Sequence, residues 1–260
     1  MKKILFALII LLISCEQTVK DPDLPYVEKL VIESIFTEGE IIDSIIITRT
    51  LPPLGEYSFE KALVTDAEGY IEIDGEKHEL EFNKNQYDSD LTAKVGKKYK
   101  LAVRWKNLKA YATTFVPPKV TIDTAVHRFV ENEWDENTYT FHLNAVIHPI
   151  DNTCYSGKSE RHFFYDVRNN THKNNSGRIL VPFFRHDYII SDTTQFKLHD
   201  PVKGLIYSFD ESFYDYFNTR DFGNEEGTIF GISGRNVEWN VKGDGLGLFM
   251  GYNVKEFEVE

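Results

Sequence analysis

The feature that most constrains the fold is a series of short runs in which apolar and polar residues alternate, with turn residues between the runs. A period of two places every second side chain on the same face of a strand. Asp74-Gly75, between two runs, is the dipeptide typical of a two-residue β-hairpin. The pattern predicts a mainly all-β fold. The clearest run has one apolar face, made of Tyr99, Leu101, Val103 and Trp105.

Residues 28–118 are predicted to form an N-terminal immunoglobulin-like β-sandwich. About seven short strands in roughly 90 residues, without a convincing helix, are typical of that architecture. Pro117-Pro118 closes the series and is the best boundary between two domains. Besides the run around Leu101, the predicted strands are Leu30–Thr37, Ile41–Thr50, Ala62–Thr65, Tyr70–Ile73, His78–Phe82 and Ala110–Val116.

Residues 119–260 are predicted to form a second β-sandwich domain with one helix, 208–221. Ser208 followed by Glu211 three residues later is a capping box, which predicts the start of the helix. An apolar stripe along it predicts a face that packs against the sheet. The stripe consists of Phe209, Phe213, Tyr216 and Phe217. The predicted strands are Val120–Phe129, Tyr139–Ile147, Arg161–Val167, Arg178–Phe184, Tyr188–Ile190 and two in the glycine-rich tail from Gly243.

The first residues resemble a bacterial lipoprotein signal. Lys2-Lys3 precede ten apolar residues, 4–13, and Ser14-Cys15 follow. As a helix, ten residues span about 15 Å, half of a ~30 Å hydrocarbon core, so the segment is too short to cross a membrane. We predict a signal peptide over 1–14, lipidation of Cys15, and a polar tether over 15–27.

Charge and cysteine content narrow the possible partners. Without Lys2 and Lys3 the chain has 27 basic and 41 acidic side chains. A chain this acidic is repelled by phosphate backbones, so nucleic acid is excluded as an expected partner. If Cys15 carries lipid, Cys154 has no intramolecular partner, and we interpret it as a buried, unreactive thiol.

Several segments in their order along the chain are similar to one family. They are Ala62–Asp66, Val95–Leu101, Ile122–Thr124, Phe213–Phe217, Asn236-Val237 and Gly243–Phe249. Together with the lipoprotein signal, these segments resemble the Bacteroidota lipoproteins grouped as domain of unknown function 4249. The family more often has two glycines where this chain has Gly243-Asp244. The resemblance implies a lipoprotein of the outer membrane, exposed on the cell surface and accompanying a TonB-dependent receptor. It implies no catalytic residue.

Motifs for cofactors and metals are incomplete. Gly157-Lys158-Ser159 resembles the end of a phosphate-binding loop, but Asn152 stands where that loop needs a glycine, so no nucleotide is expected. His142 and His148 are about 20 Å apart on an extended strand, too far to share one ion. Asp88-Ser89-Asp90 supplies only a fragment of a calcium site. We therefore predict no catalytic residue, no metal and no cofactor.

Two functions are open at this point. The first is a non-enzymatic accessory module that docks on an outer-membrane β-barrel receptor or transporter. The second is a surface lipoprotein that binds glycans or nutrients. Trp134 lies in a polar stretch and is a possible contact residue, because an exposed tryptophan there marks a contact surface. Its alternative role is packing against its own domain.

Overall fold

The computed structural model describes residues 26–53, 55–132, 135–159, 172–173, 179–189, 202–220 and 237–259. Within these ranges the chain consists mainly of strands in four sheets, with two short helices, α2 (Phe59–Ala62) and α3 (Ser212–Arg220). The predicted mainly β fold is confirmed. No helix in this part of the chain is long and apolar enough to span a membrane.

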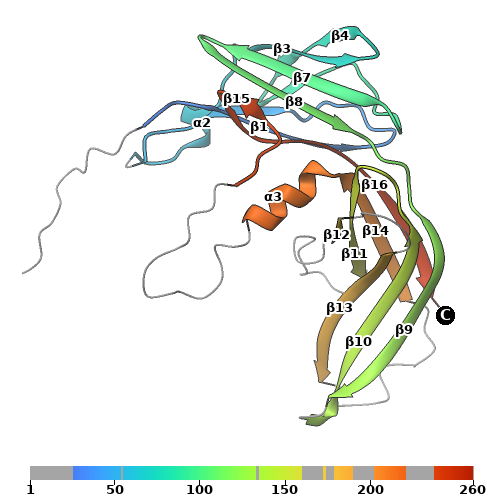
Figure 1. Cartoon of the computed structure of the whole chain (residues 1–260). Coiled ribbons are helices and arrows are strands. Elements are labelled where there is room, and N and C mark those ends of the chain that lie inside the picture. Colours follow the sequence, from blue (N-terminus) through green and yellow to red (C-terminus); the bar gives the residue numbers. More distant parts are fainter. Residues whose placement is uncertain are drawn as a thin grey trace, which may run out of the picture.

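One layer of the N-terminal sandwich is a five-stranded antiparallel sheet in the order β15-β8-β7-β3-β4 (Figure 1). At the tip of the β3–β4 hairpin, Asp74 and Gly75 have φ angles of 53° and 87°. Two positive φ angles are what a type I′ turn requires, so the predicted hairpin is confirmed. The strands are β3 (Glu68–Ile73), β4 (Glu76–Glu79), β7 (Lys98–Trp105), β8 (Leu108–Phe115) and β15 (Lys242–Gly243).

The opposite layer belongs to a six-stranded sheet in the order β12-β11-β14-β16-β1-β2. In it β1 pairs in parallel with β16 along its whole length, from Leu30 opposite Gly245 to Thr37 opposite Tyr252. The last strand of the chain therefore completes a layer of the N-terminal sandwich, and a two-domain division at Pro117-Pro118 is not confirmed. The strands are β1 (Leu30–Thr37), β2 (Ile46–Arg49), β11 (Thr153–Ser159), β12 (His172–Lys173), β14 (Val202–Asp210) and β16 (Gly245–Val259).

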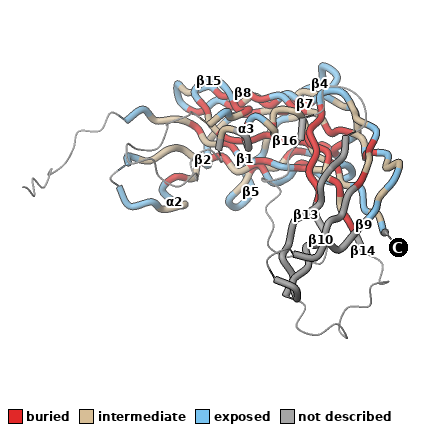
Figure 2. Tube along the Cα trace, turned by 60° about the horizontal axis from the view of Figure 1, so that its bottom comes forward, coloured by how far each residue is buried: buried red, intermediate tan, exposed pale blue. Residues whose placement is uncertain are grey.

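The main core lies between these two layers. The apolar face predicted around Leu101 is buried, including Trp105, whose indole N–H donates to Asp66 Oδ1 at 2.8 Å. From the other layer, Phe36 packs edge-on against Tyr99, with ring centroids 5.4 Å apart. Each large apolar side chain buried here contributes about 1.5–3 kcal/mol. Figure 2 shows the buried positions concentrated in this sandwich.

The remaining strands form two smaller sheets. The three-stranded sheet, in the order β13-β10-β9, confirms the strands predicted at Val120–Phe129 and Tyr139–Ile147. The separate runs predicted at Arg178–Phe184 and Tyr188–Ile190 are one strand, β13. The strand predicted at Arg161–Val167 lies outside the described residues. The elements are β5 (Glu81–Asn83) and β6 (Gln86–Asp88), which pair with each other, and β9 (Thr121–Asn132), β10 (Asp135–His148) and β13 (Ile179–Ile189).

The C-terminal helix begins later than predicted, so the capping box over 208–211 was wrong. Ser208 lies inside β14, which is paired with strands on both sides, and its hydroxyl donates to the Pro118 carbonyl at 3.1 Å. Pairing with strands on both sides provides hydrogen-bond partners for the backbone of β14, whereas the first turn of a helix leaves its N–H groups without partners in the helix. Helix α3 begins at Ser212, whose backbone N–H donates to Asp210 Oδ1 at 3.0 Å.

Three residues of the predicted apolar stripe form a packing face, although Phe209 precedes the helix, and the Phe217 side chain lies outside the described residues. Phe209 and Phe213 stack with ring centroids 4.4 Å apart, the first on β14 and the second on α3. Tyr216 joins the same cluster with buried Cys154 and Met250. The stripe therefore fixes the helix against the end of the sheet.

A helical turn replaces part of the strand predicted at Ala62–Thr65. The hydroxyl of Ser58 accepts from Lys61 N at 3.4 Å, and Leu63 N donates to the Phe59 carbonyl at 2.8 Å. Because Ser58 caps this turn, Ala62 is helical and not extended.

Candidate binding surface

The two residues that the sequence analysis singled out for function, Cys15 and Trp134, lie outside the described residues. Their roles in lipidation and contact remain predictions. The Gly157–Ser159 segment lies in β11, opposite β14, and is part of a sheet ladder, not a loop. Among the side chains that the structure describes, no three His, Cys, Asp or Glu residues are grouped as metal ligands.

Cys154 is buried, which disfavours a role as a nucleophile. Its thiol has no exposed surface, and Sγ lies 3.6 Å from the Asp210 carbonyl oxygen. Burial raises the pKa of the Cys154 thiol well above its ordinary value, because a thiolate would lose its hydration there. The predicted burial of Cys154 is confirmed, and its lack of reactivity stays a prediction.

A first hollow, of about 630 Å³, lies where β8 meets the start of α3. Its central carboxylate, Asp210, is fully engaged by neighbours. Oδ2 accepts from Thr114 Oγ1 at 3.2 Å and Phe115 N at 3.1 Å, while Oδ1 accepts from the backbone and hydroxyl of Ser212. Asp210 therefore fastens β14 and α3 to β8, and this carboxylate has a structural role.

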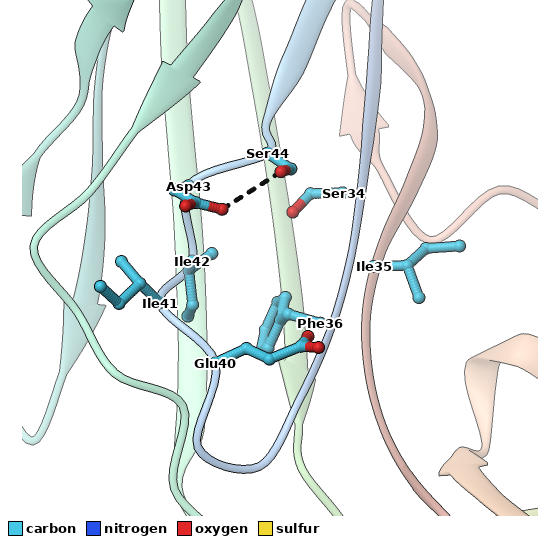
Figure 3. Close-up of a pocket in the computed structure, with 8 residues that line it drawn as sticks. All are labelled: Ser34, Ile35, Phe36, Glu40, Ile41, Ile42, Asp43 and Ser44. Atoms are coloured by element: carbon cyan, nitrogen blue, oxygen red, sulfur yellow. Dashed lines mark hydrogen bonds between the residues drawn. The ribbon is translucent and has the colours of Figure 1, made fainter.

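A second hollow, of about 380 Å³, follows the turn after β1 (Figure 3). Glu40 closes this turn by accepting from Thr37 N at 3.2 Å, and Asp43 accepts from the Ser44 hydroxyl at 3.1 Å. Ile35 lies across β1 from Asp43 and Ser44. The polar groups serve the turn itself, and the exposed apolar side chains do not converge on the hollow.

The third hollow is a groove of about 680 Å³ between β4 and the segment 81–90, which we call the β4 groove. One polar contact joins its two walls, since His78 Nδ1 lies 2.8 Å from Asp90 Oδ1. Within the second wall, Asn83 donates to Asp88 Oδ2 at 2.7 Å. The carboxylates of Asp88-Ser89-Asp90, which resembled a calcium fragment, thus contact protein partners.

Other carboxylates of the β4 groove have no such contact with a described protein group. Within the described residues, Glu76, Glu79 and Glu81 form no ion pair and no side-chain hydrogen bond, and all three are exposed. The ammonium group of Lys77 lies over the Tyr70 ring, 4.0 Å from its centroid. The groove therefore presents a surplus of negative charge.

The backbone of β4 is open on the groove side. Leu80 N donates to the Gly69 carbonyl at 2.8 Å, and in an antiparallel ladder such paired residues alternate with residues that point the other way. Lys77 and Glu79 therefore direct their N–H and C=O groups away from β3. No other strand in the described part of the chain pairs with β4 (Figure 1), which lies at one end of its sheet.

Sequence comparison adds the family to this geometry. The model of the family named domain of unknown function (DUF4249) matches residues 18–258. The chain belongs to the DUF4249 family. The match includes both sandwich layers and β16, so the shared sheet lies within the DUF4249 region. No curated protein and no solved structure matches this DUF4249 chain.

The β4 groove was not predicted, although the sequence of β4 carried one signal for it. The predicted strand began at His78, whereas β4 begins at Glu76 and consists of Glu-Lys-His-Glu. Charged residues on both faces of a short strand are typical of a sheet edge. The opposite wall, Asp88–Asp90, comes close to β4 only because the β5–β6 hairpin folds back, which no local pattern indicated.

Proposed function

We propose that this DUF4249 protein is a lipid-anchored, non-enzymatic binding module of the outer membrane. It faces the cell exterior and serves as an accessory of a TonB-dependent receptor or of another outer-membrane complex. The observation that carries the binding role is the β4 groove, an open sheet edge with unpaired carboxylates. Exposed edges of this kind bind extended segments of other proteins. The anchor rests on the lipoprotein signal that ends at Cys15.

A binding role is favoured over an enzymatic one because the described ionisable groups that could act in catalysis are hydrogen-bonded, buried or paired. Asp210 is occupied by four hydrogen bonds, Cys154 is buried, and His78 is paired with Asp90. General acid–base or nucleophilic catalysis needs such groups to converge on one accessible point. None of the three hollows offers that convergence among the residues described.

Affinity capture from gently solubilised membranes, followed by mass spectrometry, tests the accessory role. We expect an outer-membrane β-barrel receptor or transporter to be captured with the protein. Capture of the protein alone, at native abundance, contradicts the role. Glycan binding that is abolished by Trp134→Ala would favour the alternative of a glycan- or nutrient-binding lipoprotein, for which no described residue provides support.

Fractionation tests the anchor separately. Cys15→Ser removes the sulfur that would carry lipid, so we expect the variant to leave the membrane fraction. Cys154→Ala is the matched control and should stay with membranes. Protease added to intact cells should digest the parent protein if it faces outward. Membrane retention of Cys15→Ser would refute lipid anchoring at this residue.

A further inference from the structure

We infer that the β4 groove binds an extended peptide segment of a partner protein, with Lys or Arg at alternate positions, as an additional strand beside β4. The inference deepens the proposed function and rests on it. The open N–H and C=O groups of Lys77 and Glu79 provide the hydrogen bonds. An added strand satisfies such groups by the same ladder that joins neighbouring strands of a sheet.

The charge of the groove selects the occupant. In an added strand, every second side chain points to the groove side, where it meets Glu76, Glu81 and the opposite wall. A basic side chain there gains from opposite charge, and an acidic one is repelled. A second copy of β4 would place glutamates against glutamates, so the same charges that admit a basic segment oppose self-association.

Contacts between protein side chains shape the groove. The contact from His78 to Asp90 joins the two walls, and the hydrogen bond from Asn83 to Asp88 braces the second wall internally. A preformed site reduces the entropy lost on binding. Phe82, 38% exposed, packs edge-on against Tyr87 with ring centroids 5.2 Å apart. Its ring offers an apolar surface for the methylene stem of a lysine or arginine.

The first test uses the full chain in detergent and three fluorescent peptides of nine residues. One alternates Lys and Val, one alternates Glu and Val, and the third is the Lys peptide with alternate backbone amides N-methylated. We expect the Lys peptide to bind at least about tenfold more tightly than either of the others, because only it has both the charge and the backbone donors. Equal binding of the N-methylated peptide would show attraction by charge alone and overturn strand addition.

The second test changes the edge of β4 itself. Glu79→Pro removes the N–H that points away from β3 and leaves the β3–β4 ladder intact, since proline is tolerated on a strand edge. Glu79→Ala is the matched control, with the same loss of charge and a retained N–H. We expect Glu79→Pro to bind the Lys peptide at least about fivefold more weakly than Glu79→Ala. Equal binding by the two variants would overturn the inference.

Two readouts separate this inference from the proposed function and from misfolding. The thermal midpoints of both Glu79 variants report folding, and the peptide comparison on the parent protein needs no variant. If Glu79→Pro still captures the membrane complex while the Lys peptide fails to bind, the accessory function stands and the β4 inference falls. If the Lys peptide binds but no membrane complex is captured, the β4 inference stands and the accessory function falls.

Discussion

Removing the Asp210 carboxylate should loosen the attachment of β14 and α3 to the N-terminal sandwich. Asp210→Ala deletes four hydrogen bonds, two of them from the backbone N–H groups of Phe115 and Ser212. The hydroxyls of Thr114 and Ser212 can turn to other acceptors, but the two backbone donors cannot. Both donors are half-buried, so each one left without a partner costs about 1.5 kcal/mol, and we expect a loss of about 3 kcal/mol in the free energy of unfolding.

Urea unfolding followed by tryptophan fluorescence measures this loss, and calorimetry should show a decrease in the melting temperature of about 6–12 °C. Asp215→Ala is the control, because Asp215 lines the same hollow but is exposed and accepts no hydrogen bond through its side chain from a described residue. The control should cost about 0.5 kcal/mol or less. If Asp210→Ala costs no more than the control, the role of Asp210 as a fastening is refuted.

Three further predictions follow from burial and close approach. Cys154 should resist alkylation by iodoacetamide in the native protein at pH 8 and react after denaturation, since burial raises the pKa of its thiol; native labelling within minutes would contradict this. Gly251→Ala should lower the free energy of unfolding by at least about 2 kcal/mol, because an added Cβ would lie 2.4 Å from the Phe115 carbonyl oxygen. An unchanged thermal midpoint would contradict this close approach of the two backbones. Burial raises the pKa of Tyr155 from 10.0 to about 12, so its contribution to stability is complete below pH 10 and is lost as pH rises through 12. Over that range the urea midpoint of Tyr155→Phe should fall less steeply with pH than the midpoint of the parent protein. Equal slopes would contradict this prediction.

The parallel pairing of β1 with β16 changes how the two halves of the chain relate. A parallel pair needs a long connection, and here nearly the whole described chain lies between the two strands. Phe249 of β16 packs against Phe36 of β1 within the N-terminal core, with ring centroids 5.3 Å apart. The C-terminal half is therefore required to complete the first sandwich, and truncation at Pro117 would expose that core.

Local patterns were sufficient where one physical rule decides the outcome. The alternation around Leu101 placed that face in the core because a strand presents every second residue to the same side. Asp74-Gly75 formed the expected turn because few residue pairs adopt two positive φ angles. Local signals failed at Ser208, where pairing with two neighbouring strands outweighed a capping motif.

By itself, then, the sequence determined the mainly β architecture, the buried faces of its strands and the order of the family's segments. Only the tertiary structure decided that β16 lies beside β1, that Asp210 joins β14 to β8, and that β4 is left with an open edge opposite Asp88–Asp90. The physical reason is the sequence separation over which the deciding interactions act. Alternation and turn preference are properties of neighbouring residues, whereas strand partners and unpaired edges depend on side-chain packing between segments that are distant in sequence.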